Sequence, residues 1–357
     1  MGCRVALWGT GNVGRHALAG IDARPDLELV GVWVSNPAKV GRDAGELAGL
    51  GRELGVLASG DADEVLALRP DCVVNTAMAD DRLGDAVDDL RRMLRAGCNV
   101  VSSGPVFLQY PHGVVPEPLV EEIDRAGREG GASLWVNGVD PGFANDWLPL
   151  TLTGISERID EVRCLEILNY ATYRQATVLF DIMGFGRPLS ETPLLLMPGV
   201  LTSAWGSVVR QLAAGLDVTL DGVRESYERL PATETFEIAA GTIERGTAAA
   251  LRFEVSGLVG GRPVLVLEHV TRLHDDLGPD WPQPTGQGCY RVEVRGEPNY
   301  SLDLRLLGGD GDHNTAGLKA TAMRLVNAVP SVVAAAPGLL TALDLPLITG
   351  RGLVRPV

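Results

Sequence analysis

The chain has 357 residues, 45% of them hydrophobic and 22% charged, which is the composition of a folded protein with room for two domains. Asp and Glu outnumber Lys and Arg by 46 to 31. The formal net charge of -15 argues against nucleic acid as a partner, because its phosphates would be repelled. The five cysteines are scattered and form no C-x-x-C pair, a pattern that favours reduced thiols in the cytoplasm over disulfides or a zinc site.

The sequence gives no sign of a membrane partner. The start "MGCRVALWGTG" passes directly from Met1 into a predicted strand and leaves no room for a secretory leader. The most apolar tract, residues 330–348, is interrupted by Pro330, Pro337 and Pro346, so we do not expect it to span a membrane. We therefore expect a cytoplasmic protein.

Short apolar runs alternate with helical segments up to about residue 150, which predicts a doubly wound parallel sheet. The pattern predicts strands at 3–9, 27–35, 71–77, 99–104 and 133–139, and helices at 13–21, 81–97 and 118–130. Beyond this point, alternation with period two over 160–170, 232–273 and 287–296 predicts a mostly antiparallel sheet. Helices are predicted at 199–215 and at 313–336, the second with an N-terminal cap at Asn314 or Thr315.

We expect three segments from this change of pattern. Residues 1–150 form a dinucleotide-binding Rossmann domain, and residues 151–312 an α+β substrate and dimerisation domain. Residues 313–357 supply a C-terminal helix and a tail that return to the Rossmann domain.

The segment "GTGNVG" contains Gly9, Gly11 and Gly14 in the spacing G-x-G-x-x-G. It follows a predicted strand and opens a predicted helix, which is the context that separates a dinucleotide site from an ordinary glycine-rich turn. The first glycine allows the tight turn, the second lets a pyrophosphate approach the backbone, and the third lets helix and strand pack closely. The free N–H groups of the helix then face the phosphates.

The second predicted strand ends in "VWVSNPAKVGR", without the acid that usually binds the ribose hydroxyls of NAD. Ser35, Asn36, Lys39 and Arg42 can instead bind a 2′-phosphate, although the two bases can equally be solvated surface charges. The pattern favours NADP, with NAD as the alternative. Further cofactor contacts are expected at strand ends, in the glycine loop and in the last helix: Thr10, Asn12, Val13, Asn75, Thr76, Ala77, Ser103, Gly104 and Asn327.

The motifs "GTGNVG", "SNPAKVGRDAGEL", "VVSSG…YP", "GVDPGF" and "VNAVP…PGL…DLP" occur in this order along nearly the whole chain. In this order the chain resembles the dihydrodipicolinate-reductase-like superfamily, in particular the 2,4-diaminopentanoate dehydrogenases and native amine dehydrogenases. The resemblance implies a Rossmann domain, an α+β catalytic and dimerisation domain, a homodimer, and a last helix that packs near the nicotinamide. It also implies reversible hydride transfer between NAD(P)H and a C=N or C=O carbon.

The chain departs from these relatives in two respects. The His-His and downstream Lys pattern of dihydrodipicolinate reductase is absent. The amine dehydrogenases carry a Glu after the fifth strand that holds the ammonia or amine, whereas this chain has Pro105, Val106 and Phe107 there. The resemblance therefore leaves the use of ammonia open.

Three residues are candidates for acid–base chemistry: His112, Asp140 and Tyr173. His112 lies in a loop beyond a strand end, and histidine titrates near neutral pH; a loop histidine without a role is the alternative. Asp140 precedes Pro-Gly and is either catalytic or the cap of the next helix. Tyr173 can donate to a carbonyl oxygen, although aromatic residues at such a spacing are more often part of a core or an interface.

The substrate pocket is expected to include Phe107, Phe143, Asn145, Trp147 and Tyr170. Trp8 and Trp135 are further pocket candidates that core packing would explain equally well, and His269 is expected to be structural or on the surface. No residue spacing indicates a metal site.

The sequence thus predicts an NADP-preferring oxidoreductase that acts on a small ketone, imine or amine by reductive amination or oxidative deamination. A carbonyl or imine reductase that does not use ammonia is one alternative. A non-catalytic NADP-binding sensor is the alternative from another class.

Overall fold

The computed structural model describes residues 2–79 and 82–354, so that residues 1, 80–81 and 355–357 of the expected segments lie outside it. The chain divides into two compact units, Met1–Val139 with Leu318–Val357, and Asp140–Gly317. The second unit is thus inserted between two parts of the first. The roles expected for the three sequence segments stay predictions.

The first unit is built on a parallel sheet of seven strands in the order β15-β6-β5-β4-β1-β2-β3. The order reverses between β1 and β4, which is where a doubly wound sheet opens a crevice at the carboxyl ends of its strands. The strands are β1 (Cys3–Trp8), β2 (Leu27–Trp33), β3 (Ala58–Ser59), β4 (Cys72–Asn75), β5 (Asn99–Ser102), β6 (Ser133–Val136) and β15 (Gly338–Leu340).

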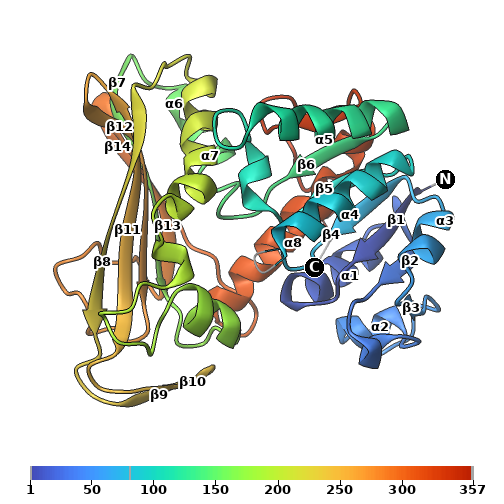
Figure 1. The fold of residues 1–357 in the computed structure, drawn as a ribbon, viewed down its shortest axis with the longest axis horizontal. Coiled ribbons are helices and arrows are strands. Elements are labelled where there is room, and N and C mark those ends of the chain that lie inside the picture. Colours follow the sequence, from blue (N-terminus) through green and yellow to red (C-terminus); the bar gives the residue numbers. More distant parts are fainter. Residues whose placement is uncertain (1, 80–81, 355–357) are drawn as a thin grey trace. The chain divides into compact units, whose positions relative to one another are not determined.

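Helices cover both faces of this sheet, because its strands carry apolar side chains on both sides (Figure 1). On β1, Val5 and Leu7 face the core beneath α1 and α8, whereas Ala6 and Trp8 face the core beneath α4 and α5. The helices of this unit are α1 (Asn12–Asp22), α2 (Ala44–Ala48), α3 (Ala62–Ala67), α4 (Leu83–Arg95) and α5 (Glu117–Gly130), with single turns η1 (Pro37–Lys39) and η2 (Val106–Gln109).

The second unit is built on a mixed sheet of six strands in the order β14-β13-β7-β12-β11-β8. Its neighbours pair antiparallel except β7 and β12, which are parallel. The strands are β7 (Arg158–Asn169), β8 (Gly222–Pro231), β11 (Ala248–Val259), β12 (Arg262–Arg272), β13 (Gly288–Glu297) and β14 (Tyr300–Leu304), beside a small hairpin of β9 (Phe236–Ile238) and β10 (Gly241–Ile243).

One face of this sheet is covered by α7 (Val200–Gly215), which contacts β8, β11 and β12 (Figure 1). The unit also contains α6 (Trp147–Thr153), a π-helical turn η3 (Thr177–Ile182) and a short turn η4 (Leu194–Leu196). Helix α8 (His313–Val333) begins in the second unit and continues into the first. None of the helices within 2–79 and 82–354 has the length and hydropathy that crossing a membrane requires.

The fold class predicted from the sequence is confirmed: a parallel doubly wound sheet and a second, mostly antiparallel sheet. The expected cap of α8 at Asn314 or Thr315 is wrong. The Asp312 carboxylate accepts the Thr315 N–H at 2.7 Å, which places the cap before the helix. The short strands β3, β14 and β15 were not expected, because two to five residues carry too little periodicity to be recognised. The ten-residue strand β8 was not expected either, because most of its side chains are polar or charged.

Candidate functional site

The three glycines of the β1–α1 turn differ in what a side chain at their position would contact. A Cβ atom on Gly9, whose φ is +91°, would lie 2.8 Å from the Ala77 nitrogen, and one on Gly14 would lie 2.1 Å from the Gly9 oxygen. Both positions therefore exclude a side chain because of the protein's own packing. A Cβ on Gly11 would meet no described atom within 4 Å. Packing does not require glycine there, and the open space would let a ligand approach the backbone closely.

Gly11 is also the N-cap of α1, and no described side chain caps that helix. The first N–H groups of α1, which include those of Asn12 and Val13, are thus available to an anion. The space above Gly11 and this uncapped helix end fit the pyrophosphate of a dinucleotide.

The ends of β4 and β5 support the glycine loop through hydrogen bonds. The Thr76 hydroxyl donates to the Gly9 oxygen at 2.7 Å, and the Asn75 side chain donates to the Ser102 hydroxyl at 3.0 Å. The Asn75 side-chain oxygen accepts the Ala77 N–H at 3.2 Å. The structure thus brings Asn75, Thr76 and Ala77 to the loop, and Ser103 and Gly104 follow the end of the adjacent strand β5.

The polar residues after β2 are divided between the loop and local contacts. Lys39 Nζ donates to the Thr10 oxygen at 2.8 Å and lies 3.1 Å from the Thr10 hydroxyl, so its charge is at the glycine loop. Arg42 instead pairs with Glu46 at 2.8 Å on the surface. Ser35 and Asn36 are exposed, and the Asn36 side chain accepts the Ala38 N–H.

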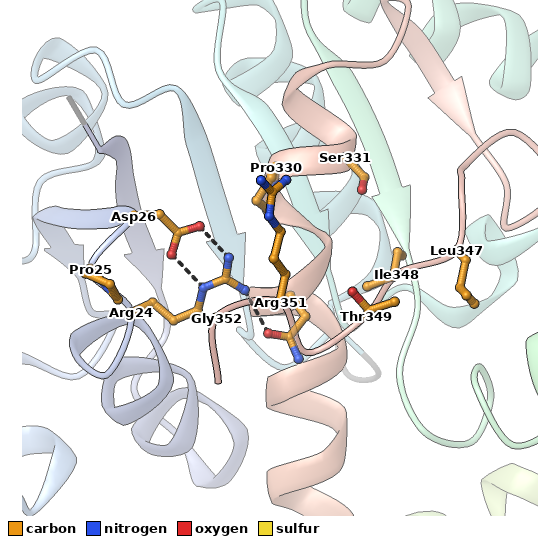
Figure 2. Close-up of a pocket in the computed structure, with 11 residues that line it drawn as sticks. Arg24, Pro25, Asp26, Pro330, Ser331, Leu347, Ile348, Thr349, Arg351 and Gly352 are labelled. Carbon is orange, nitrogen blue, oxygen red and sulfur yellow. Dashed lines mark hydrogen bonds and ion pairs between the residues drawn. The ribbon is translucent and has the colours of Figure 1, made fainter. Parts of the chain in front are cut away.

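Asn327 lies at the opposite end of α1 from the glycine loop. Its side-chain oxygen accepts a bond from Arg24 at 2.9 Å, and Arg24 also pairs with Asp26 (Figure 2). These residues line a pocket of about 580 Å³ next to the C-terminal segment. This placement argues against the expected contact of Asn327 with the cofactor.

The loop after β5 places His112 at the surface, and its predicted catalytic role stays a prediction. The His112 side chain is 50% exposed, stands 4.0 Å from Glu117 and meets the Tyr110 ring edge-on. Phe107 packs against the core between the sheet, α4 and α5, and Trp8 and Trp135 are fully buried in the sheet. The two tryptophans are therefore core residues rather than a pocket.

The second unit contains a buried cluster of ionisable side chains: Asp140, Glu166 and His269. His269 Nε2 lies 3.2 Å from Asp140 Oδ1, and His269 Nδ1 lies 3.9 Å from Glu166 Oε2. The side chains of Asp140, Glu166 and His269 are only 4%, 5% and 8% exposed. The imidazole thus joins two carboxyl groups away from water.

Strand register assembles this cluster. Glu166 on β7 is paired with His269 on the parallel strand β12 and with Tyr290 on the antiparallel strand β13. Asp140 arrives from the connection that follows β6 by four residues. Residues far apart in the sequence therefore meet on one face of the sheet.

Aromatic and amide groups hold the cluster in place. Phe253 stacks on His269 at 4.6 Å, and Trp205 contacts the same ring edge-on while its indole N–H donates to Asp140 at 3.1 Å. The Tyr170 hydroxyl donates to Glu166 at 2.8 Å. These contacts fix the orientation of all three ionisable groups.

The cluster separates the pKa values of its two acids. Desolvation raises the pKa of Glu166 to about 8, and the charge of Asp140 adds to the rise. Burial opposes ionisation of Asp140 as well, but His269, Trp205 and Asn145 outweigh it and lower its pKa. The carboxyl groups likewise outweigh burial at His269 and raise its pKa. The three shifts thus favour an ionised Asp140 and a protonated His269 beside a protonated Glu166.

Of the remaining predicted residues, Asn145 contacts Asp140, and Tyr173 contacts Tyr170. Tyr173 stacks on Tyr170 at 5.0 Å and donates to Gln175, and the Asn145 side chain reaches Asp140. Phe143 and Trp147 are partly buried on the same connection. The alternative that Asp140 caps the next helix is wrong, because the Asp146 carboxylate accepts the Trp147 N–H at the start of α6.

Possible ligand atoms of Asp140, Glu166 and His269 all lie within 4.8 Å of one another, the spacing of a metal site. However, the two carboxyl groups face different nitrogens of one imidazole ring. The Glu166 and Asp140 carboxyl groups also hydrogen-bond to each other, which accounts for their proximity without an ion. The geometry suits a protonated imidazole between two carboxyl groups better than a shared metal ion.

The sequence led us to expect His269 to be structural or on the surface, and it did not indicate the contact of His269 with Glu166. The signal was a charged residue inside an otherwise apolar strand, in "CLEIL" and in "VLEHV". Buried ionisable groups are rare without a partner, so two of them in neighbouring strands indicate a contact.

Comparisons with known proteins identify the family of this chain. The pattern of the "2,4-diaminopentanoate dehydrogenase C-terminal domain" matches residues 143–353, and "Dihydrodipicolinate reductase, N-terminus" matches residues 3–82. An amine dehydrogenase from Streptomyces virginiae is 44% identical over 96% of this chain and 95% of its own length. The chain belongs to the amine dehydrogenase family. This protein is accordingly an oxidoreductase with a dinucleotide-binding fold.

Two more distant relatives of this amine dehydrogenase family member extend the comparison. The 2,4-diaminopentanoate dehydrogenase of Acetoanaerobium sticklandii is 25% identical over 73% of this chain and 70% of its own length. The structure of an amine dehydrogenase from Mycobacterium smegmatis matches with a TM-score of 0.78 and 26% identity, covering 98% of this chain and 97% of the other. The match spans both units of the fold.

Proposed function

We propose that this protein is an NADP-preferring amine dehydrogenase that interconverts a small amine with the corresponding ketone and ammonia. In the oxidative direction the amine, water and NADP⁺ give the ketone, ammonia, NADPH and a proton. The observation that carries the proposal is the buried acid cluster of Asp140, His269 and Glu166, in a chain whose relatives bear the name amine dehydrogenase.

The cofactor site is proposed at the β1–α1 turn. Gly11, the first N–H groups of α1 and the ends of β4 and β5 would hold the pyrophosphate and its surroundings. The bound dinucleotide supplies the hydride chemistry. Lys39, which already lies at Thr10, is the proposed partner of a 2′-phosphate.

Glu166 is the proposed general acid and base. Reductive amination requires a proton donor when water leaves the adduct of ketone and ammonia, and a base for the reverse step. Glu166 retains its proton at neutral pH, and Tyr170 fixes one of its oxygens. The adjacent Asp140–His269 pair provides fixed charges for the amine nitrogen, a part that relatives give to the acid missing at 105–107.

The first test is reductive amination of small ketones by purified protein with NADPH, with and without ammonium chloride. We expect NADPH consumption that requires ammonia. Consumption without ammonia would instead establish the carbonyl reductase, which the replacement of the acid by Pro105, Val106 and Phe107 favours. Turnover in neither condition across a broad panel would contradict both reactions.

The second test replaces the proposed acid. Glu166→Gln removes the titratable proton and should lower kcat by roughly 10²- to 10⁴-fold, with unchanged NADPH affinity measured by fluorescence. Glu228→Gln on β8, where the side chain is exposed, is the matched control. Full activity in Glu166→Gln would contradict the assigned role.

The proposal also covers the oligomeric state of the enzyme and its location in the cell. The enzyme is proposed to be a homodimer, as the family resemblance implies, and cytoplasmic, as the scattered cysteines suggest. Light scattering during size exclusion measures the first, and a monomer at working concentration would contradict it.

A further inference from the structure

Tyr290 extends the row of side chains that contains the acid cluster. On one face of the sheet in the second unit, strand register places Tyr290 directly opposite Glu166, and Glu166 beside His269. Side chains that face each other across neighbouring strands have Cβ atoms roughly 5 Å apart. The phenol ring therefore starts next to the proposed acid, although the proposed function gives it no role.

Three tyrosine side chains lie near Glu166, and two of their hydroxyl groups are already occupied. Tyr170 donates to Glu166 at 2.8 Å, and Tyr173 donates to Gln175 at 2.8 Å. Tyr290 is only 3% exposed, yet its hydroxyl makes no hydrogen bond to any residue that the structure describes, and its oxygen is not closed to solvent. Since a buried tyrosine hydroxyl normally has a partner, this one is available to a bound molecule.

A glycine in α8 leaves room beside this hydroxyl. A Cβ atom on Gly317 would lie 3.3 Å from the Tyr290 oxygen, which is closer than ordinary van der Waals contact. Apart from the backbone of its own helix, it would meet no other described atom within 4 Å. Alanine is the more stable residue inside a helix, so folding alone would favour a methyl group there. The glycine instead keeps space open next to the unpaired hydroxyl.

The charged groups that act on the Tyr290 hydroxyl are acids. Burial, together with the charges of Glu166 and Asp140, raises the pKa of Tyr290 well above its ordinary range, so the phenol keeps its proton at neutral pH. His313, whose ring lies 5.7 Å from that of Tyr290, has a lowered pKa because it is buried. A neutral phenol in these surroundings suits a neutral oxygen of a substrate, whereas the acids would repel a carboxylate.

We propose that the Tyr290 hydroxyl determines specificity by hydrogen-bonding a hydroxyl group on the carbon next to the amine-bearing carbon of the substrate. Tyr290 and Glu166 start from opposite positions on neighbouring strands, so together they fit polar groups on adjacent carbon atoms. The preferred substrates are then 1,2-amino alcohols and the matching hydroxy ketones. This inference rests on the proposed function, because it takes the acid cluster as the reaction centre.

The test measures amine binding to the full-length protein saturated with NADPH, a complex in which the amine cannot be oxidised. Calorimetric titration compares 2-aminobutan-1-ol with butan-2-amine, which has the same carbon skeleton without the hydroxyl group. We expect the Kd of the amino alcohol to be about tenfold lower, and 2-aminobutanoate to bind no more tightly than butan-2-amine. Equal Kd values for the amino alcohol and the amine, or tightest binding of 2-aminobutanoate, would overturn the proposal.

Tyr290→Phe keeps the ring and removes only the hydroxyl group. The preference for the amino alcohol should disappear in this variant, while the Kd of butan-2-amine and the melting temperature stay unchanged. Tyr227→Phe is the matched control, because it removes an exposed hydroxyl from β8 on the same face of the sheet. A preference that persists in Tyr290→Phe, or that is lost equally in Tyr227→Phe, would overturn the assignment.

Gly317→Ala tests the space beside the hydroxyl. The added methyl group should reduce the preference for 2-aminobutan-1-ol without lowering the melting temperature, since alanine favours the helix. Gly84→Ala in α4, where a Cβ atom would meet no described atom within 4 Å, should keep the preference. An unchanged preference in Gly317→Ala would overturn the part assigned to this space.

The outcomes separate this proposal from the proposed function. If the NADPH complex binds neither amine, the proposed function is contradicted and the role of Tyr290 is refuted with it. If the complex binds both amines with the same Kd, the proposed function stands and only the role of Tyr290 is refuted.

Discussion

Glu166 combines burial with a hydrogen bond from Tyr170, and this combination gives the rate a defined pH dependence. Its pKa of about 8 means that the carboxylate, the base needed for amine oxidation, forms as the pH rises past that value. At saturating amine and NADP⁺, kcat for oxidation should rise with an apparent pKa near 8. This rise of kcat, the limb of the pH profile near pH 8, is measured from the absorbance of NADPH by stopped-flow or steady-state kinetics across the pH range.

The same profile recorded for Glu166→Gln tests the assignment, since glutamine does not titrate. The limb near pH 8 should disappear in this variant and persist in Glu228→Gln. If Glu166→Gln kept the limb at the same pH, another group of the cluster would be responsible.

Lys39 is the residue on which the choice between NADP and NAD depends. Its ammonium group lies at the Thr10 oxygen, close to where phosphates are expected, whereas Arg42 is paired with Glu46. Lys39→Ala should weaken NADPH binding by about ten- to a hundredfold through loss of a charged hydrogen bond, and NADH binding far less.

Fluorescence titration of both nucleotides measures this selectivity, with Arg42→Ala as the control. Equal losses for NADPH and NADH in Lys39→Ala would refute the assignment of the 2′-phosphate site.

At the scale of one structural element, the β1–α1 turn contains one glycine that packing requires, Gly14, and one that is expected to matter only for binding, Gly11. Gly14→Ala places a methyl group against the Gly9 oxygen and should destabilise the fold by roughly 1–3 kcal/mol. Gly11→Ala meets no described atom, so stability should remain while NADPH binding weakens. Chemical denaturation and nucleotide titration of both variants measure the two effects.

One result from these two variants would contradict a pyrophosphate site at the β1–α1 turn. If Gly11→Ala bound NADPH as tightly as the unchanged protein, the space above this residue would have no part in holding the pyrophosphate.

Across the whole molecule, the acid cluster links stability to pH. Between the ordinary glutamate pKa of 4.5 and about 8, folded Glu166 keeps a proton that the unfolded chain has released. His269, whose pKa is raised above 6.5, acts in the same direction at higher pH. The free energy of unfolding should therefore fall as the pH rises through this range. The lowered pKa of Asp140 matters only near and below its ordinary 3.8.

Thermal unfolding between about pH 5 and pH 9 measures this slope. It should be shallower in Glu166→Gln and unchanged in Glu228→Gln. A slope that is equal in all three proteins would mean that Glu166 titrates alike in the folded and unfolded chain.

Most of the architecture was predictable because its signals are local. The glycines of the first turn and the long apolar strands indicate their structure within a few residues of sequence. The acid cluster was only partly predictable: Asp140 stood out beside Pro141, but its partner His269 lies 129 residues away. The contact of His269 with Glu166 depends on the register between β7 and β12, which no periodicity encodes.

The insertion of one unit into the other has a consequence for exchanging parts between relatives. One join, at Val139 and Asp140, falls in a connection, but the other, at Gly317 and Leu318, falls inside α8. Leu325, Val326 and Val329 beyond this join pack in the first unit's core. One residue added or removed at the join would rotate them by about 100°. A unit transplanted from a relative must therefore join this helix with the same number of residues, so that the helical phase is preserved.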